Sequence, residues 1–260
     1  MIIIAGPCQL ESFEHANMIA EHCRDVCSKY DVEYYFKASF DKANRSHIDS
    51  KRGLGYTNGI KALKKIKKES EVKVLTDFHE PGQINWRVRK HIDVVQIPAF
   101  LCRQTDLLLT AKDSGCIINV KKGQFLAPWD VAGILSKTGK ENVWITERGA
   151  SFGYNQLVVD FTGIQYMRDT YGVPVIFDAT HSVQQPGGLG KSSGGNRAYV
   201  PGLIRAVCAQ GIDGVFLEVH DDPDNAPSDG PNAVWLRNFD NIIESIMEYD
   251  YESRKSVGAN

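Results

Sequence analysis

The feature that most constrains the fold is a succession of short apolar runs separated by segments of helical period. The runs are rich in Val, Ile, Leu and Phe, as expected of strands that are buried on both faces of a parallel sheet. They occupy residues 2–5, 34–38, 72–77, 93–98, 116–121, 142–147, 174–179 and 214–219. A series of eight such units predicts an α/β fold, a closed (βα)8 (TIM) barrel, in preference to an open doubly wound sheet.

The segments between and after these runs supply helical candidates, at residues 14–30, 57–69, 103–115, 199–211 and 236–251. There is no internal repeat and no linker-like boundary, so we expect a single barrel domain over residues 1–260. That length is ordinary for one such barrel. Because the first run begins at Ile2, we expect no additional element to close the barrel floor.

Charge and hydropathy argue against several classes of protein. A net charge of −2 gives no global reason to bind nucleic acid or an anionic membrane. No apolar run approaches the roughly 18 residues of a membrane span, and the start lacks the basic region of a secretory signal. We therefore expect a cytoplasmic protein. Its six scattered cysteines, which lack CxxC spacing, argue against a disulfide framework.

Polar side chains follow every predicted strand, at the end where barrels of this kind carry their chemistry. In chain order they are Cys8; Lys37, Ser39, Lys42, Asn44, Arg45 and Ser46; Asp77 and His79; Gln96; Lys121 and Lys122; Glu147 and Arg148; Asp178 and His181; and Glu218, His220 and Asp229. A random distribution would place polar residues at both ends of the strands. The pattern predicts one site at the barrel mouth.

A cationic subset of these residues predicts an anionic substrate. Desolvating several cations is costly unless anions join them, so their convergence indicates two or more phosphate or carboxylate groups. The alternative is a solvated basic rim, or lysines paired with neighbouring acids. The subset consists of Lys37, Lys42, Arg45, Lys121 and Arg148.

A second subset predicts a metal site. Cys8, His181, Glu218 and Asp229 belong to the first, seventh and eighth units, which become neighbours when a barrel closes. Thiolate, imidazole and carboxylate together favour Zn or Fe over Mg. Taken singly, Cys8 could be a core residue, His181 a hydrogen-bonded strand end and Asp229 a turn former.

One Gly-rich segment, residues 187–196, resembles a phosphate-binding loop but fails its pattern, which requires glycine where Gln185 stands. We predict instead a mobile loop over the barrel mouth. The GxGxxG, HExxH, GxSxG and EF-hand patterns are also missing from the sequence. Nicotinamide chemistry, zincin chemistry and serine hydrolysis therefore lack support.

Several long motifs resemble those of the 3-deoxy-D-manno-octulosonate 8-phosphate synthases, also called 2-dehydro-3-deoxyphosphooctonate aldolases. The resemblance extends from Ile3 to about Asn232 and rests on residues 36–46, 96–108, 119–130, 147–160, 178–188 and 228–232. It implies a (βα)8 barrel that is usually a homotetramer. It also implies condensation of phosphoenolpyruvate with D-arabinose 5-phosphate and water, for the inner core of lipopolysaccharide.

The same resemblance implies roles for individual residues. Cysteine rather than asparagine at position 8 is typical of the metal-dependent subgroup, with a divalent ion such as Zn, Fe or Mn. The implied metal ligands are Cys8, His181, Glu218 and Asp229. The implied phosphoenolpyruvate contacts are Lys37, Ser39, Lys42, Ala99, Lys121 and Arg148. Asn44, Arg45 and Ser46 would receive the pentose phosphate, partly from a neighbouring subunit. We expect Lys121, His181, Asp229 and Cys8 to be catalytic.

Two alternatives stay open at this point. A related synthase could use erythrose 4-phosphate, although residues 42–46 argue against it because that family has a different basic motif there. A silent barrel that only binds sugar phosphates is the other, although the complete ligand set speaks against loss of activity. Whether a metal would act on the aldehyde or on the water also stays open.

Overall fold

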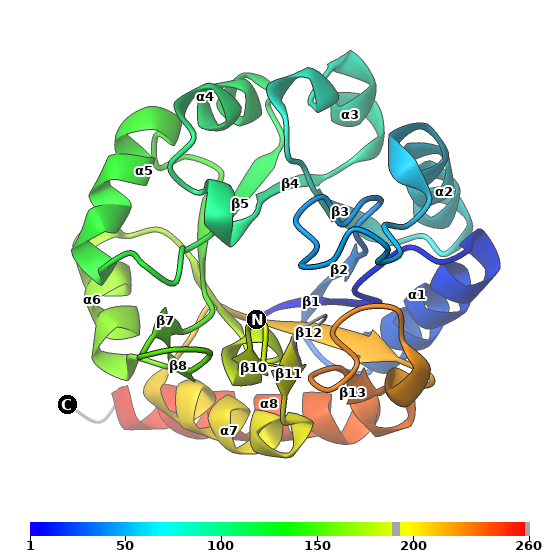
Figure 1. Cartoon of the computed structure of the whole chain (residues 1–260). Coiled ribbons are helices and arrows are strands. Elements are labelled where there is room, and N and C mark those ends of the chain that lie inside the picture. The colour runs from blue at the N-terminus through cyan, green and yellow to red at the C-terminus, as the bar shows by residue number, and fades with distance from the viewer. Residues whose placement is uncertain (189–192, 258–260) are drawn as a thin grey trace.

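Parallel strands close into a barrel in the computed structural model, which describes residues 1–188 and 193–257 (Figure 1). The barrel strands of this described part are β1 (Ile2–Gly6), β2 (Glu33–Lys37), β3 (Lys73–Asp77), β4 (Val94–Ile97), β5 (Ile117–Lys121), β6 (Val143–Glu147), β9 (Val175–Asp178) and β12 (Gly214–His220). Each pairs with the next in that order, and β12 pairs with β1. Closure is in the register that places Ile2 beside Gly214 and Gly6 beside Glu218. The predicted (βα)8 barrel is confirmed.

Helices surround the barrel on its outside (Figure 1). They are α1 (Phe13–Cys27), α2 (Gly55–Glu69), α3 (Trp86–His91), α4 (Thr105–Asp113), α5 (Val131–Thr138), α6 (Phe161–Tyr171), α7 (Val200–Gln210) and α8 (Phe239–Val257). The five helical candidates correspond to α1, α2, α4, α7 and α8. Two starts have side-chain caps: Ser12 accepts from the His15 amide at 3.1 Å, and Asp160 accepts from the Gly163 amide at 3.0 Å.

Alternation along the strands produces two apolar layers. Ile3 and Ala5 belong to the large cluster between strands and helices, whereas Ile4 belongs to a separate cluster inside the barrel. Successive residues of a strand point to opposite faces, which explains this division. The inner cluster consists of Ile4, Tyr35, Leu75, Val94, Trp144, Ile176 and Phe216. It forms an apolar floor inside the barrel. Inward-facing side chains two residues further along each strand lie above this floor.

Short strand pairs follow three of the barrel strands at the mouth. β7 (Ala150–Ser151) pairs with β8 (Leu157–Val158), β10 (Gln184–Gln185) pairs with β11 (Gly194–Gly195), and β13 (Val234–Trp235) pairs with β12. The predicted mobile loop at 187–196 follows β10 and includes β11, and its residues 189–192 are outside the described part of the chain, so its mobility stays a prediction. Among the described helices, none is long and apolar enough to cross a membrane.

Candidate active site

Two-residue steps along the strands bring the polar side chains into the barrel. Tyr35 belongs to the apolar floor, and Lys37 follows it on the same face of β2. In the same way, Glu218 follows Phe216 on β12. Above the floor, Gln96 donates to Asn119 at 2.7 Å, which satisfies polar atoms that water cannot reach. The strand pattern therefore places an ordered polar layer directly on an apolar one.

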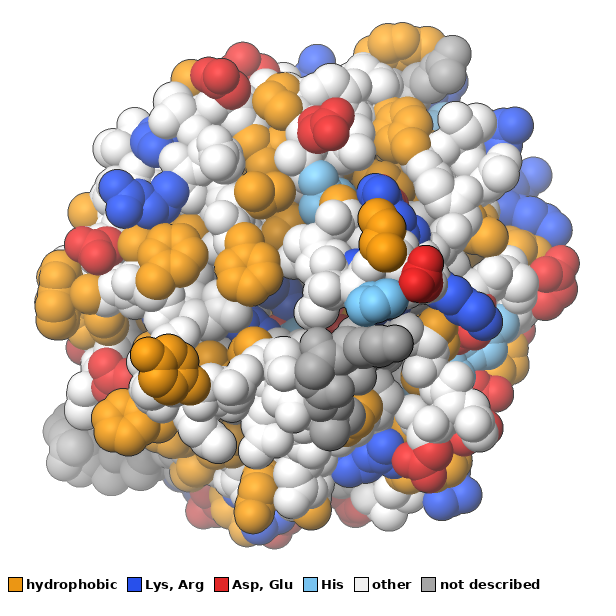
Figure 2. All heavy atoms as spheres, in the orientation of Figure 1, with side chains coloured by type: hydrophobic (Ala, Val, Ile, Leu, Met, Phe, Trp, Pro, Cys, Tyr) orange, Lys and Arg blue, Asp and Glu red, His pale blue; other side chains and the backbone are white. Residues whose placement is uncertain are grey.

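A cavity of about 330 Å³ opens above this layer at the carboxyl ends of the strands. Seen from the mouth, the molecule is hollowed near its centre, with Lys and Arg side chains inside the hollow (Figure 2). Every residue expected to bind substrate lines the cavity, as do His181 and Asp229. These lining residues are Lys37, Ser39, Lys42, Asn44, Arg45, Ser46, Ala99, Lys121 and Arg148. Cys8 and Glu218 do not line it; they are buried, at 5% and 0% exposure.

Three of the cavity's cations are deeply buried. Lys37, Lys121 and Arg148 are only 2–6% exposed. The Lys37 ammonium donates to Glu218 Oε1 at 3.0 Å. Burial alone would lower the pKa of Lys37, but the neighbouring carboxylates, Glu218 foremost and Asp77 after it, raise it above its ordinary value. Lys37 is therefore held as a cation at the cavity wall.

Lys121, Asp178 and His181 form a second buried charge cluster. The Asp178 carboxylate is fully buried, forms an ion pair with the Lys121 ammonium, and contacts His181 Nδ1 at 2.8 Å. Burial lowers the pKa of Lys121, and the charge of Asp178 only partly opposes this. Burial would also lower the pKa of His181, but Asp178 raises it to about 10. The carboxylate thus holds both neighbours in position and protonated.

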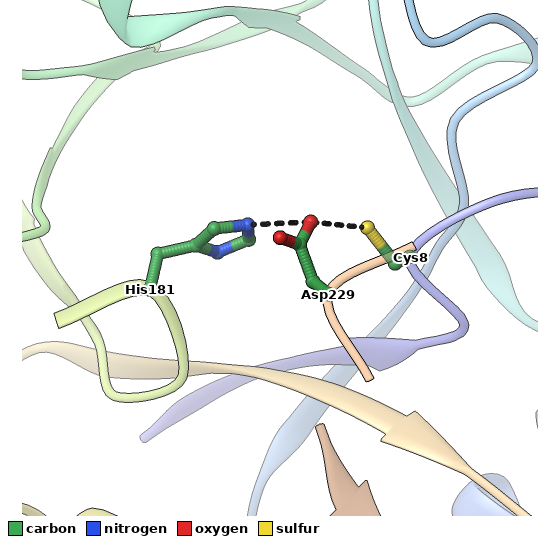
Figure 3. A group of neighbouring side chains, drawn as sticks. All are labelled: Cys8, His181 and Asp229. Atoms are coloured by element: carbon green, nitrogen blue, oxygen red, sulfur yellow. Dashed lines mark hydrogen bonds and ion pairs between the residues drawn. The ribbon is translucent and has the colours of Figure 1, made fainter. Parts of the chain in front are cut away.

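Cys8, His181 and Asp229 converge on one point (Figure 3). The Cys8 thiol donates to Asp229 Oδ2 at 3.0 Å, and His181 Nε2 lies 3.6 Å from the same oxygen. Asp229 sits in a left-handed turn with φ of 52°, which aspartate tolerates better than most residues. Burial would raise the pKa of Asp229, but His181 lowers it well below its ordinary value.

Glu218, the fourth predicted ligand, is not part of the group of three whose ligand atoms all lie within 4.8 Å of one another, but it contacts one member of it. Its Oε1 is 3.9 Å from His181 Nε2, and its Oε2 is buried with no hydrogen-bond partner in the described part of the chain. A divalent transition ion fits these residues on three counts. The donor set is thiol, imidazole and carboxylate. One buried carboxylate oxygen lacks a partner, and His181 is oriented through its other nitrogen by Asp178, as metal-binding histidines commonly are.

Arg45, on the loop between β2 and α2, is already hydrogen-bonded to other protein groups. Its guanidinium donates to Ser228 Oγ at 2.9 Å, to Gln9 Oε1 at 2.9 Å, and to the carbonyls of Pro227 and Lys51 at 2.8 and 2.9 Å. The residue lines the cavity, yet most of its donors are engaged. It connects this loop to the segment that carries Asp229.

Two residues that hydrogen-bond to the predicted site side chains were not predicted from the sequence. Gln184 accepts from Arg148 at 2.7 Å and donates to Asp229 Oδ1 at 2.7 Å, which links the cationic and ligand groups. Ser228 donates to Asp229 Oδ2 at 3.2 Å. Glutamine and serine carry no spacing signal of their own. By contrast, Lys122, whose neighbour Lys121 faces the cavity, points away and pairs with buried Glu147 at 3.3 Å.

Comparisons with known proteins agree with this geometry. The profile of the DAHP synthetase I family matches residues 1–254. A 2-dehydro-3-deoxyphosphooctonate aldolase of Rhodopseudomonas palustris is 53% identical over 99% of this chain and 91% of its own length. Proteins of the same name from Bradyrhizobium diazoefficiens and Nitrobacter hamburgensis are each 53% identical over 95% of this chain and 89% and 87% of their own lengths.

The family profile is named for DAHP synthetase, whereas these nearly full-length relatives are named 2-dehydro-3-deoxyphosphooctonate aldolase. Identity of about half the residues over the whole barrel is the more specific finding. The chain therefore belongs to the DAHP synthetase I family and, within it, to the 2-dehydro-3-deoxyphosphooctonate aldolases.

Proposed function

We propose that this chain condenses phosphoenolpyruvate with D-arabinose 5-phosphate and water to give 3-deoxy-D-manno-octulosonate 8-phosphate and inorganic phosphate. In the reaction, carbon 3 of phosphoenolpyruvate bonds to the aldehyde carbon, water oxygen bonds to carbon 2, and the C–O bond to phosphate breaks. The observation that carries the proposal is a cavity in which Lys37, Lys121 and Arg148 lie beside a thiol, imidazole and carboxylate group.

Phosphoenolpyruvate binds at the buried cations in this proposal. Its phosphate and carboxylate need positive partners in a site where water is partly excluded. Arg148 gives one bond to Gln184 and has further donors for a bidentate grip. Ser39 Oγ is buried without a partner in the described structure and can bind a substrate oxygen. Lys42 and Ala99 complete the lining on this side.

The pentose phosphate binds at Asn44, Arg45 and Ser46, at the outer part of the cavity. Arg45 can reach a phosphate only if it exchanges some of its present acceptors. The exchange is favourable because a doubly charged phosphate is a stronger acceptor than a carbonyl, a hydroxyl or an amide oxygen. If Arg45 released Ser228 to bind the phosphate, the hydrogen bond from Ser228 to Asp229 would also be affected.

Lys121, His181, Asp229 and Cys8 act on the reacting atoms. The lowered pKa of Lys121 makes its ammonium a better acid for the departing phosphate than an ordinary lysine. Asp178 accepts from His181 Nδ1 at 2.8 Å and so fixes the orientation of the ring, which places Nε2 3.6 Å from Asp229 Oδ2. Asp229 Oδ2 lies between the thiol and the imidazole and is placed to orient a water molecule.

A divalent metal ion, Zn, Fe, Mn or a similar ion, is held by Cys8, His181, Glu218 and Asp229. When bound, such an ion supplies a Lewis acid that polarises an oxygen ligand. Glu218 would contribute a carboxylate oxygen; its Oε1 pairs with Lys37, and its Oε2 has no protein partner in the described chain. The Cys8 thiol and the protonated His181 imidazole must each lose a proton on binding, so uptake of the ion should release acid.

The working form is a homotetramer in the cytoplasm, where the product serves the lipopolysaccharide inner core. Support for assembly comes from large aromatic side chains that are exposed near the mouth, including Phe100 and Phe125, each 57% exposed, and Trp129, 62% exposed. Exposed apolar groups of this kind favour a protein interface. Light scattering coupled to gel filtration measures the assembly directly.

The decisive experiment is phosphate release from phosphoenolpyruvate with each candidate aldose phosphate. Rapid release with D-arabinose 5-phosphate, and little with D-erythrose 4-phosphate, is the expected result. The opposite preference would assign the chain to the other synthase of the family. Tight binding of either sugar without phosphate release, in metal-loaded protein, would identify a barrel that only binds its ligands.

A further inference from the structure

A second cluster of metal-binding side chains lies outside the cavity, where the end of β12 meets the start of α1. Glu11, His15 and His220 each bring one ligand atom within 4.8 Å of the others. Glu11 precedes α1, His15 lies in its first turn and His220 ends β12. None of the three lines the cavity or contacts its cations in the described structure. The cluster is therefore a separate candidate site.

The geometry selects one atom from each residue. Glu11 Oε1 lies 2.8 Å from His220 Nε2 and 3.8 Å from His15 Nδ1. The two imidazole rings are 4.7 Å apart, centroid to centroid. Ligands about 2 Å from a tetrahedral ion are separated from one another by roughly 3–3.5 Å. These two separations lie on either side of that value, and the third pair of ligand atoms lies within 4.8 Å, so small side-chain rotations would bring all three to ligand positions.

His15 Nδ1 is the strongest sign of a missing partner. It is buried and has no hydrogen bond in the described part of the chain, whereas the opposite nitrogen of the ring contacts Asp221 Oδ1 at 2.8 Å. An imidazole that is held by a carboxylate through one nitrogen presents the other as a metal ligand. The second imidazole is held differently: His220 Nδ1 accepts from the backbone amide of Asp222 at 2.9 Å, with the same Asp221 oxygen 3.2 Å away. Asp221 therefore orients His15, and the Asp222 amide orients His220.

We propose that Glu11, His15 and His220 form a second binding site for a divalent transition ion, with Asp221 orienting the imidazole of His15 and the Asp222 backbone amide orienting that of His220. Two imidazoles and one carboxylate suit Zn²⁺, Co²⁺ or Ni²⁺ and disfavour Mg²⁺, which prefers oxygen. The side chains of Glu11 and Asp221 are 35% and 46% exposed, so an ion can enter from solvent and keep water as a further ligand. The ion would join the start of α1 to the end of β12.

Cobalt distinguishes this site from the one at Cys8, because only a thiolate ligand gives a sulfur-to-cobalt charge-transfer absorption. Metal-stripped full-length protein is dialysed against Co²⁺ alone, and bound cobalt is measured together with the spectrum. The wild type should bind a second equivalent that adds ligand-field absorption without adding charge-transfer absorption. Glu11→Gln and His15→Gln should each lose that equivalent and keep the charge-transfer band.

His22→Gln is the matched control, since His22 is an exposed histidine on the same helix, and it should bind as much cobalt as the wild type. Circular dichroism verifies folding, and the exposed position of Glu11 keeps one variant usable if His15→Gln folds poorly. The inference is overturned if the wild type binds no cobalt beyond that accompanied by the charge-transfer band. It is equally overturned if both variants keep the second equivalent. If the wild type binds cobalt but shows no charge-transfer band, the site at Cys8 is contradicted, whereas the site at Glu11, His15 and His220 is not.

Discussion

Asp178→Asn tests whether one buried carboxylate organises the cavity. The substitution preserves volume but removes the charge that faces the Lys121 ammonium and His181 Nδ1 at 2.8 Å. The Asp178 side chain is fully buried, so water cannot solvate the Lys121 and His181 groups in place of the lost carboxylate. Removal of one partner from a buried ion pair costs about 3–5 kcal/mol. We expect the free energy of unfolding of metal-free protein to fall by that amount.

The loss should depend on pH in a defined direction. Burial would raise the pKa of Asp178, but His181 and Lys121 hold it below its ordinary value, so the unfolded chain binds more protons in acid. The advantage of the wild type is therefore present at neutral pH and shrinks as pH falls below about 4. In the variant, the unpaired Lys121 has a lowered pKa. Its stability should therefore rise as pH increases from 7 toward about 10.

Urea unfolding is followed by circular dichroism with chelator present and is repeated from acid pH to about pH 10. It gives the free energy of unfolding of each protein and its dependence on pH. Asp106→Asn is the control, because Asp106 is an exposed carboxylate in the first turn of α4. It should change the free energy of unfolding by no more than about 1 kcal/mol. If Asp178→Asn is as stable as that control, or if its deficit does not vary with pH, the charge cluster does not work as argued.

Three further predictions concern other parts of the site. Cys8→Asn should keep activity that chelators do not abolish, while Cys8→Ser should lose most activity once stripped of metal; chelator titrations that superimpose on the wild type would make the thiol a core residue. Arg148→Ala should impair phosphoenolpyruvate use and Arg45→Ala should raise the KM for the pentose phosphate, each contact being worth about 1.5–3 kcal/mol; equal effects on both substrates would refute the two-site assignment. Gly6→Ala should lose about 1–3 kcal/mol in urea unfolding, because its Cβ would lie 2.1 Å from a β2 carbonyl. Gly82→Ala, which meets nothing within 4 Å, should not.

The barrel could be predicted because its strands are buried on both faces. A strand such as β12 is a nearly continuous apolar run at 214–219, interrupted only by Glu218, and the structure places it at Gly214–His220. Three of the described helices, α3, α5 and α6, were not among the candidates, and α6 was missed although it has eleven residues, as many as α7. α3 has only six residues, too few for a helical period to repeat, and α5 has eight. Their positions depend on packing against the barrel, which no local pattern records.

The site could be predicted only as far as strand ends allow. Alternation along β5 distinguishes Lys121, which lines the cavity, from Lys122, which pairs with Glu147 outside it. No local pattern brings Cys8 to Ser228, which is 220 residues away yet has its Oγ at 3.3 Å from the thiol. That contact depends on the register of two strands and on a turn at Asp229. Distances of this kind belong to the closed barrel and not to any segment of it.

Both candidate metal groups lie along the junction where the first barrel strand meets the last. β1 pairs with β12 so that Gly6 stands beside Glu218, and Cys8 and His220 each follow two residues later. A shift of one residue in this register would turn alternate side chains to the opposite face and disperse both groups. Neither group can exist before residues more than 200 positions apart are joined, so an ion at either one binds the closed barrel and not the unfolded chain. By linkage, each bound ion stabilises the closure that created its site, by about 2.7 kcal/mol when the free ion is at 100 times its Kd.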